Sequence, residues 1–282
     1  MDNSNTLISI ATYKESENIV ELISQIRINN PTIKILIIND NSNDSTPEII
    51  QKLNDKNLFL LERPSKLGLG TAHKLSMFFA IKYHYSFLLT MDGDFSHDPI
   101  YIPKLLREAN LNSFVIGSRF ITDGKTDYTG LRKYVSLIGN YVAKKFLKIN
   151  CNEFTTYFRV YSVNVLKKLP FNELNSEGYS LGVRVIWLMN RMGINLTEIP
   201  IHFKDRNKGK SKIPKLQIFI SFFDLLSIKL KDIFIKQKFY ETDETYKFTN
   251  FFQNCDKKSC DRSFLAKNKQ QWVCLLCGNI YK

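Results

Sequence analysis

An alternation between two hydrophobic patterns over the first 120 residues constrains the fold of this chain more than any other feature. Short apolar runs, each long enough for one buried strand, occur at residues 7–11, 34–38, 57–61, 86–91 and 113–117. Between them, apolar residues recur at helical spacing over residues 17–28, 47–53, 70–83 and 99–108. Strands that alternate with helices form right-handed βαβ units, and unbroken apolar runs suit strands buried on both faces. The pattern predicts an α/β fold, an open and mostly parallel twisted sheet with helices on both faces.

The rest of the chain divides into a continuation of this domain and two appendages. Residues 131–147 and 179–192 have helical periodicity, and residues 155–162 and 196–203 have the pattern of strands. We therefore expect one domain over residues 1–212. The composition changes at Ile213, so we treat residues 213–240 as an amphipathic segment and residues 241–282 as a separate tail.

The charge balance restricts the class of partner. The chain has 40 Lys and Arg against 27 Asp and Glu, a formal net charge of +13. Such an excess favours an anionic partner, which could be nucleic acid, a phospholipid surface or a phosphorylated substrate. The first residues have neither the basic region nor the long apolar run of a secretory signal peptide. We expect the protein in the cytosol, or peripherally on the cytosolic face of a membrane.

Two carboxylates leave the fourth predicted strand one residue apart, at Asp92 and Asp94. Ligands of open α/β sheets bind at the carboxyl ends of the strands, and Gly93 allows close approach of the backbone. The carboxylates alone would repel a diphosphate, whereas a bridging Mg²⁺ or Mn²⁺ would be bound by carboxylate and phosphate oxygens together. The pair predicts a divalent metal site, and the alternative is an acidic turn that only caps the next helix.

Eight short motifs follow one another in an order that is specific, although each motif alone is not. They lie at residues 11–18, 38–46, 66–72, 91–99, 117–120, 132–133, 158–161 and 206–212. On these motifs, from Leu7 to about Lys212, the chain resembles the dolichol-phosphate mannose synthase group of inverting nucleotide-sugar glycosyltransferases with the GT-A fold. The activity that the resemblance implies is metal-dependent transfer of a hexose, mannose from GDP-mannose, to a dolichyl or other polyprenyl phosphate.

The resemblance also implies a role for each part of the site. The nucleoside of the donor would be bound by Ala11, Tyr13, Glu15, Ile38 and Asp40. The metal and the diphosphate would be held by Asp92, Gly93 and Asp94, with Ser96 near the third ligand position. The acceptor phosphate would meet Arg119, Arg132 and Lys133, and a mobile loop would bring Arg206 and Lys212 to the donor phosphates. Asp94, Arg119 and Arg132 are the expected catalytic residues, and arginine forks match phosphate oxygens in geometry.

The chain departs from the pattern of this family at several polar positions. Ala11 stands where the family usually has proline, Lys14 where it has asparagine, and Asn39 where it has the first of two aspartates. A Lys-Gly-Tyr-X-Phe-Gln-X-Glu pattern of the family corresponds here to residues 177–184, which end in Arg184. These differences bear on the identity of donor and acceptor more than on the type of reaction.

Two other functions remain open from the sequence. A transferase that extends a surface glycan from a sugar hydroxyl would need a carboxylate base, for which Glu177 and Asp98 are candidates. A phosphate acceptor needs no such base, because it is already largely dianionic at neutral pH. A nucleic-acid-binding protein would use the basic surface and the tail, but the basic residues lie among the nucleotide-sugar motifs, and the sequence has no helix-turn-helix or RNA-binding signature. We do not expect nucleic acid as a partner.

The segment after the main domain has an apolar stripe at helical spacing. Its members are Leu216, Phe219, Ile220, Phe223, Leu226 and Leu230. Charged residues interrupt the segment, and a central aspartate such as Asp224 opposes insertion across a bilayer. The pattern predicts an amphipathic segment that lies on a membrane surface, or equally a helix that packs on the main domain.

Four of the five cysteines lie in two close pairs near the end of the chain. The pairs are Cys255 with Cys260 and Cys274 with Cys277, separated by thirteen residues. This spacing is close to that of a zinc site with four thiolate ligands, and zinc would stabilise a tail with few apolar residues. We expect a small structural zinc-ribbon-like unit, which could bind a protein partner.

Overall fold

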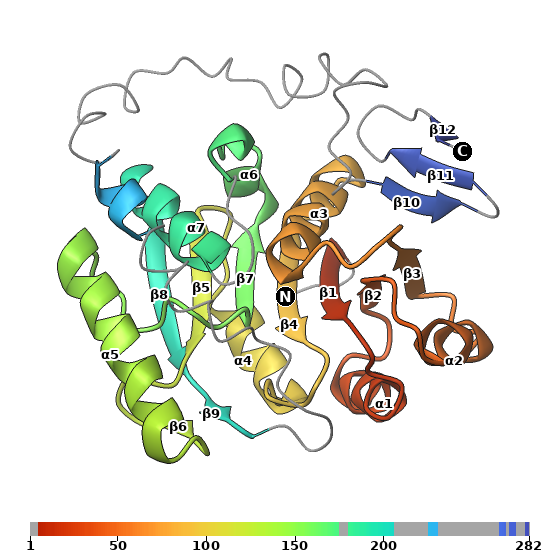
Figure 1. Cartoon of the computed structure of the whole chain (residues 1–282), viewed down its shortest axis with the longest axis horizontal. Helices are drawn as coiled ribbons and strands as arrows, with labels where there is room; N and C mark the ends of the chain where they lie inside the picture. The colour runs from red at the N-terminus through yellow and green to blue at the C-terminus, as the bar shows by residue number, and fades with distance from the viewer. Residues whose placement is uncertain are drawn as a thin grey trace.

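The computed structural model of the chain describes residues 5–174, 180–205 and 225–230, together with the backbone of residues 265–268, 271–274 and 280–281. A seven-stranded sheet in the order β3-β2-β1-β4-β7-β5-β8 forms its centre (Figure 1). The strands are β1 (Thr6–Thr12), β2 (Lys34–Asn39), β3 (Leu58–Glu62), β4 (Phe87–Asp92), β5 (Ser113–Ser118), β7 (Arg159–Ser162) and β8 (Asn195–Pro200). Within this sheet, β7 runs antiparallel to both of its neighbours and the other pairings are parallel. The predicted open, mostly parallel sheet is confirmed.

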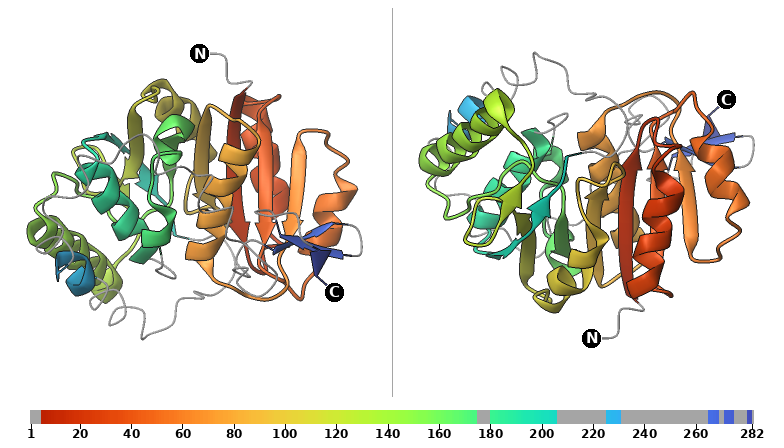
Figure 2. Two further views of the ribbon diagram at one scale, coloured as in Figure 1. Left: turned by 90° about the horizontal axis from the view of Figure 1, so that it is seen from above. Right: turned by 90° about the horizontal axis from the view of Figure 1, so that it is seen from below.

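Helices cover both faces of the sheet, as the sequence pattern predicted (Figure 2). One face carries α1 (Ile19–Asn29), α2 (Thr46–Lys52) and α4 (Ile102–Arg107), which follows the short 3-10 helix η2 (Pro99–Tyr101). The other face carries α3 (Leu69–Lys82), α6 (Val163–Leu166) and α7 (Ser180–Arg191), with the 3-10 helix η3 (Phe171–Glu173) between the last two. Helix α5 (Gly130–Leu147) lies at the outer edge, beyond β8 (Figure 1). Each layer is held by apolar burial, as in α1, whose buried residues recur at helical spacing.

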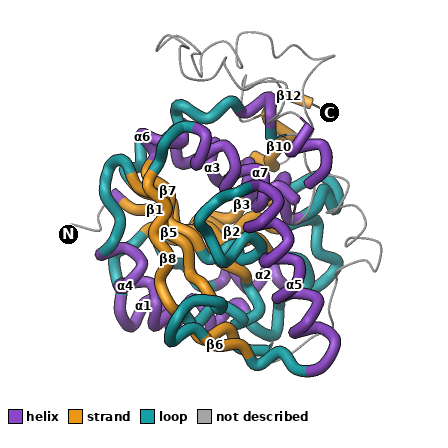
Figure 3. Tube along the Cα trace, turned by 90° about the vertical axis from the view of Figure 1, so that its left-hand side faces the viewer, coloured by secondary structure: helices purple, strands orange, loops and turns teal. Residues whose placement is uncertain are grey.

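Two expected strands differ from the structure. The strand expected from residue 155 begins at Arg159, because the preceding residues form a loop in which Glu153 accepts the N–H groups of Thr155 and Thr156. The strand expected over residues 196–203 is divided at Ile201 into β8 and the short β9 (His202–Phe203). Strand β9 leaves the main sheet and pairs with β6 (Lys125–Thr126) in a separate two-stranded sheet. Figure 1 labels both strands, and Figure 3 shows β6 at one end of the molecule, beyond the main sheet.

Only parts of the two predicted appendages fall within the described residues. In the segment 213–240, residues 225–230 are described; they are helical and bury Leu225 and Ile228 in the core of the main domain. The tail contributes an antiparallel sheet of β10 (Leu265–Asn268), β11 (Gln271–Cys274) and β12 (Ile280–Tyr281). The remaining cysteines of the predicted zinc site, Cys255, Cys260 and Cys277, lie outside the described residues, and the structure gives no support to a zinc ribbon. Within the part of the chain that the structure describes, no helix has the length and the apolar composition needed to cross a membrane.

Candidate active site

The register of the central strands brings three polar strand ends to one edge of the sheet. Thr12 at the end of β1 pairs with Asn39 at the end of β2. On its other side, Ala11 of β1 pairs with Asp92 at the end of β4. The polar residues that follow these strands are therefore neighbours, although up to 80 residues of chain separate them.

A tight turn at the end of β4, residues 92–97, carries the three predicted metal ligands Asp92, Asp94 and Ser96, and we call it the carboxylate turn. Asp94 accepts the N–H of Ser96 with its side chain at 3.1 Å, and Phe95 between them has a left-handed backbone with φ of 65°. The N–H of Asp92 donates to Nδ1 of His97 at 2.9 Å. The turn is thus closed at both ends by hydrogen bonds within six residues, and it fixes two carboxylates one residue apart.

The carboxylate turn offers the donor atoms that a hard divalent cation prefers. Asp92 and Asp94 supply carboxylate oxygens, and Ser96 follows in the same turn. Gly93 brings the backbone close to β1, since a Cβ there would lie 3.3 Å from Cγ2 of Thr12. Among the described residues, no group of three or more His, Cys, Asp and Glu side chains is arranged to hold a metal. A cation here would therefore take its remaining ligands from a hydroxyl, from water or from the phosphates of a substrate.

His97 supports the carboxylate turn as a neutral ring. It is fully buried, stacks on Phe158, and burial lowers its pKa to about 3, so the ring is uncharged at neutral pH. Because Nδ1 accepts the N–H of Asp92, the proton of the neutral ring sits on Nε2 and donates to Oγ1 of Thr156 at 2.9 Å. This bond ties the end of β4 to the loop that precedes β7.

The predicted nucleoside residues lie around the ends of β1 and β2. Both oxygens of Asp40 accept backbone N–H groups, from Leu67 and Gly68 at 2.8 Å each, so this carboxylate shapes the loop that leads into α3. Nε of the buried Arg63 lies 3.3 Å from Asp40. The Nζ of Lys66 lies 4.1 Å from the centre of the Tyr13 ring, at the rim of the same loop.

The other three predicted nucleoside residues are buried or half-buried. Glu15 is buried and accepts the side-chain N–H of Asn18 at 2.8 Å. Ile38 is fully buried in the core, while Ala11 is half-buried beside it.

A second set of polar residues is gathered around Arg119, and we call it the arginine wall; it consists of Arg119, Tyr128, Arg132, Glu153 and Thr155. Arg119 leaves the end of β5 and donates to both oxygens of Glu153, at 2.6 and 2.8 Å, and to Oγ1 of Thr155 at 2.7 Å. Burial alone would raise the pKa of Glu153, but the Arg119 guanidinium and the hydrogen bonds of Thr155 together hold that pKa below its ordinary value. The pair is therefore charged, and it fixes the guanidinium of Arg119 in one orientation.

Tyr128 brings the two predicted acceptor arginines together. The guanidinium carbon of Arg132 lies 3.6 Å from the centre of the Tyr128 ring, and that of Arg119 lies 6.0 Å from it. Arg132 also donates to Asp205 at 3.2 Å. Burial is the main cause of the raised pKa of Tyr128, and the charges of Arg132 and Arg119 oppose it. Phe203 connects the arginine wall to the carboxylate turn, because its ring centre lies 5.2 Å from that of Tyr128 and 5.3 Å from that of His97.

The remaining predicted site residues lie at the border of the described chain. Lys133 is exposed next to Arg132. After β9, the N–H of Lys204 donates to the carbonyl of Ser96, so the chain crosses the carboxylate turn immediately before residue 206. Arg206 and Lys212 themselves lie outside the described residues.

Gly124 allows the loop after β5 to fold back against the backbone of Arg119. A Cβ at this residue would lie 2.7 Å from the carbonyl carbon and oxygen of Arg119, closer than any side chain can be accommodated against backbone. The loop after β5 therefore folds directly onto the residue that carries the buried guanidinium.

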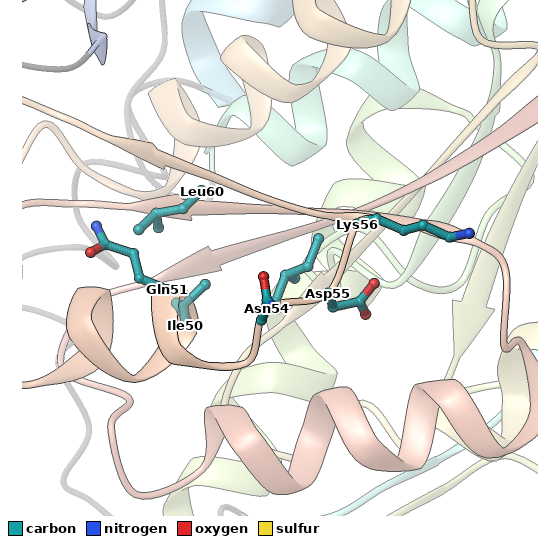
Figure 4. Close-up of a pocket in the computed structure, with 7 residues that line it drawn as sticks. Ile50, Gln51, Asn54, Asp55, Lys56 and Leu60 are labelled. Atoms are coloured by element: carbon teal, nitrogen blue, oxygen red, sulfur yellow. The ribbon is translucent and has the colours of Figure 1, made fainter.

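A pocket elsewhere on the molecule is not part of this site. It has a volume of about 350 Å³ and lies between α2 and β3, where Ile50, Asn54 and Lys56 contribute to its lining (Figure 4). These residues are near the amino end of β3, whereas the carboxylate turn and the arginine wall lie beyond the carboxyl ends of the strands. Ligands of open α/β sheets bind at the carboxyl ends.

Sequence reasoning assigned no role to four residues that hold this site together, His97, Tyr128, Glu153 and Thr156. His97 is part of a recognised motif, and its position five residues after Asp92 is the one local signal that was available. Glu153 and Thr156 meet partners 34 and 59 residues away, and no local spacing reveals such pairs.

The fold and the site define the class of protein. A mostly parallel sheet with helices on both faces, and a carboxylate pair at the end of its fourth strand, is a GT-A-like arrangement. Residues 7–170 match glycosyl transferase family 2, so the chain belongs to that family and is a glycosyltransferase.

Two curated relatives are similar over most of the chain. The chain is 29% identical to the polyprenol monophosphomannose synthase of Mycolicibacterium smegmatis over 213 residues, which cover 74% of this chain and 80% of the relative. It is 30% identical to the undecaprenyl-phosphate mannosyltransferase of Micrococcus luteus over 210 residues, 73% of this chain and 86% of the relative.

Solved structures share the fold at lower identity. The glucosyl-3-phosphoglycerate synthase of Mycobacterium tuberculosis, solved with Mn²⁺ and UDP, superposes with a TM-score of 0.56 at 18% identity, covering 79% of each chain. A mannosyltransferase of Pyrobaculum calidifontis, solved with GDP-mannose and Mn²⁺, superposes with a TM-score of 0.52 at 12% identity, covering 82% of this chain and 64% of the other.

Proposed function

We propose that this chain is an inverting, metal-dependent glycosyltransferase that moves mannose from GDP-mannose to a polyprenyl phosphate, and that it works at the cytosolic face of a membrane. The names of the two curated relatives support the mannosyl group and the polyprenyl phosphate acceptor. The Mn²⁺ bound by two structural neighbours supports a divalent cation, Mg²⁺ or Mn²⁺.

The single observation that carries this proposal is the arginine wall beside the carboxylate turn. Two guanidinium groups gather around Tyr128, whose ring contacts Phe203, and Phe203 in turn contacts His97 of the carboxylate turn. A site of this kind has an acidic side for a metal-bound diphosphate and a basic side for a second phosphate. An acceptor that brings its own phosphate needs both sides.

The residues of this chain have separate tasks in the reaction. Asp92 and Asp94 would hold the cation, which when bound neutralises the charge of the departing nucleoside diphosphate. Arg119 and Arg132 orient the acceptor phosphate, so that one of its oxygens lies in line with the anomeric carbon on the face opposite the leaving group. The oxygen forms its bond to the anomeric carbon as the bond to the diphosphate breaks, and the configuration inverts.

No side-chain base is required for this acceptor, and the described residues favour that choice. A phosphate monoester with a second pKa of about 6 is largely dianionic at neutral pH and is already a nucleophile. Asp98, one of the two candidate bases for a hydroxyl acceptor, caps η2 through Ile100 and binds Nζ of Lys204 at 2.7 Å. Arg184, at the position of the family glutamate, is buried and donates to Ser227 at 3.2 Å. Arg184 cannot serve as a base, and Glu177, the other candidate base, lies outside the described residues.

The proposal is tested by incubating the full chain with radiolabelled GDP-mannose or UDP-glucose, Mn²⁺, and dolichyl or undecaprenyl phosphate. We expect label in the lipid extract with GDP-mannose, and none when EDTA is added. Absence of lipid-extractable product with every donor and acceptor would refute the acceptor class. Equal product formation in the presence of EDTA would refute the metal dependence of the reaction.

We further propose a structural zinc ion in the tail, held by the cysteines at 255, 260, 274 and 277, and a protein partner that the tail binds. The pairing of cysteines in the sequence supports the zinc, and the segment lies beyond the residues that match the family. Metal analysis of the purified full chain should find one zinc ion per chain, and less in a Cys274→Ser variant. A wild-type chain without zinc would refute this part of the proposal, and pull-downs with and without residues 241–282 would test the partner.

A further inference from the structure

Helix α5 exposes its apolar face to solvent, the reverse of what an amphipathic helix on a soluble domain normally does. Of thirteen large apolar side chains that are exposed in the described part of the chain, seven lie on this one helix. They are Leu131, Tyr134, Val135, Leu137, Ile138, Tyr141 and Val142. Most recur at intervals of three and four residues and so form one continuous stripe, which we call the α5 stripe.

The side of α5 that contacts the protein is the opposite one, so the orientation of the stripe is fixed. Asn140 is buried and accepts the N–H of Phe154 at 2.6 Å, while Ala143 and Leu147 are buried on the same side. Lys144 donates to Asn152 at 2.7 Å. The helix is therefore anchored by amide and ammonium hydrogen bonds, and it cannot turn its stripe inward without breaking them.

The residues beside the stripe match an anionic lipid surface. Lys145 lies within the last turn of the stripe, with its ammonium 5.7 Å from the centre of the Tyr141 ring, and exposed Lys148 follows the helix. Tyrosine is typical of the level of lipid head groups, and lysine near a bilayer is attracted by anionic head groups. The centre of a protein interface is instead depleted of lysine, and the chain as a whole has a formal charge of +13.

We propose that the α5 stripe docks on the surface of an anionic phospholipid bilayer and lies in its interface. This deepens the proposed function, on which it rests for the lipid nature of the acceptor. The first turn of α5 carries Arg132, which stacks on Tyr128 in the arginine wall. A bilayer that contacts the stripe therefore brings the plane of its phosphate groups to the end of the helix where the acceptor phosphate is bound. The lipid tail of the acceptor stays in the membrane while its phosphate reaches the site.

Flotation of the full chain with vesicles tests this docking surface. The probes are vesicles of phosphatidylcholine alone and of phosphatidylcholine mixed with phosphatidylglycerol. The test variant combines Ile138→Ser with Tyr141→Ser, at side chains that are 56% and 60% exposed. The matched control combines Ile28→Ser with Ile100→Ser, two side chains that are 76% and 65% exposed but lie on other elements. None of these four residues belongs to the carboxylate turn or the arginine wall.

We expect the test variant to bind mixed vesicles at least about tenfold more weakly than wild type, because two apolar anchors are lost, and the control to bind as wild type does. Lys145→Glu should weaken binding to mixed vesicles by about fivefold or more and leave binding to neutral vesicles unchanged. Equal binding of test variant and wild type would overturn the proposal, and so would an equal loss in the control. Light scattering provides a further check. If wild type is a dimer and the test variant is a monomer, the stripe binds a second copy of the chain, and the membrane proposal is overturned.

A separate assay keeps this inference distinct from the proposed function. Transfer to a short, water-soluble prenyl phosphate without vesicles should proceed equally in wild type and in the test variant. If wild type transfers no sugar to any prenyl phosphate, the proposed function fails, whatever the flotation shows. If wild type is active and floats independently of the stripe, only the docking proposal fails.

Discussion

The two sides of the site are built in different ways. The carboxylate turn is closed by contacts within six residues of chain, between Asp94 and Ser96 and between Asp92 and His97. The arginine wall is assembled from residues that are far apart in sequence, with Arg119 bound to Glu153, 34 residues later, and Arg132 bound to Asp205, 73 residues later. The first side is set by local sequence, and the second exists only once the whole domain has folded.

This difference predicts that damage to the carboxylate turn affects chemistry, while damage to the arginine wall affects folding as well. The two sides are connected through Thr156, which accepts a hydrogen bond from His97 and donates its own N–H to Glu153. Substitutions on each side and at this connection should therefore have separable effects on metal binding, stability and affinity for the acceptor.

The largest effect is expected from Asp94→Asn. The amide keeps the size of the side chain and can still accept the N–H of Ser96, so the turn should keep its shape. It removes the negative charge that would hold the cation, and transfer should fall by roughly a thousandfold with stability nearly unchanged. Initial rates and Mn²⁺ titration calorimetry measure the two consequences. Asp98→Asn, four residues away and bound to Lys204, serves as the control and should retain most activity. Wild-type activity in Asp94→Asn would show that this turn does not bind the metal.

The second largest effect is expected on stability, from Glu153→Gln. Removal of this charge leaves the buried guanidinium of Arg119 uncompensated and should lower the free energy of unfolding by about 3–5 kcal/mol. The control is Asp55→Asn, which breaks the partly exposed ion pair with Arg27 and should cost below about 1 kcal/mol. Urea unfolding at neutral pH compares them, and equal losses would mean that burial does not distinguish the two pairs.

The same variant carries a pH dependence whose sign follows from the lowered pKa of Glu153. A carboxyl with a folded pKa below its ordinary value of 4.5 stabilises the protein above that pH, and this contribution is lost as the pH falls through the folded pKa. The difference in unfolding free energy between wild type and Glu153→Gln should therefore be largest at neutral pH and shrink below about pH 4.5. A difference that is constant with pH would contradict a charged Glu153.

The extent to which the sequence predicted this molecule follows the same division. The parallel sheet and the carboxylate turn were predicted because apolar runs and the Asp92-Gly93-Asp94 spacing are local signals, and the described structure places them as expected. The loop at residues 155–158 was predicted as strand because Thr and Tyr favour strands, but hydrogen bonds to Glu153 hold these residues out of the ladder.

The sequence also did not show which apolar helix face is exposed to solvent. The helical pattern at residues 131–147 was recognised, yet a pattern shows only that one face is apolar and does not show whether that face is covered. The sequence left open whether residues 213–240 contact a membrane or pack on the main domain. The described helical residues 225–230 bury Leu225 and Ile228 in the core, while the exposed stripe lies on α5. Which apolar face stays uncovered depends on what the other elements bury.

An intermediate effect is expected at the connection between the two sides, from Thr156→Val. The substitution keeps the shape of the side chain but removes the oxygen that accepts the Nε2–H of His97, so the support of the carboxylate turn is loosened. The affinity for Mn²⁺ should fall about tenfold, as for other residues that orient metal ligands. Thr90→Val removes a comparable buried hydrogen bond, to the carbonyl of Tyr157, and should cost similar stability without changing Mn²⁺ affinity. If both variants lose Mn²⁺ affinity equally, the effect is one of general stability and the connection has no specific role.

The smallest effect is expected from Arg132→Lys, on the exposed border of the arginine wall. Its side chain is 39% exposed and that of its partner Asp205 is 57% exposed, so loss of their ion pair should leave stability almost unchanged. An ammonium cannot reproduce the stacking on Tyr128 together with a forked contact to phosphate, and the KM for the acceptor should rise about fivefold while the KM for the donor and kcat change little. Arg107→Lys, exposed at the end of α4, is the matched control and should change neither KM. A rise confined to the KM for the donor would instead show that Arg132 binds the donor diphosphate. The arginine wall would then bind the donor and not the acceptor phosphate.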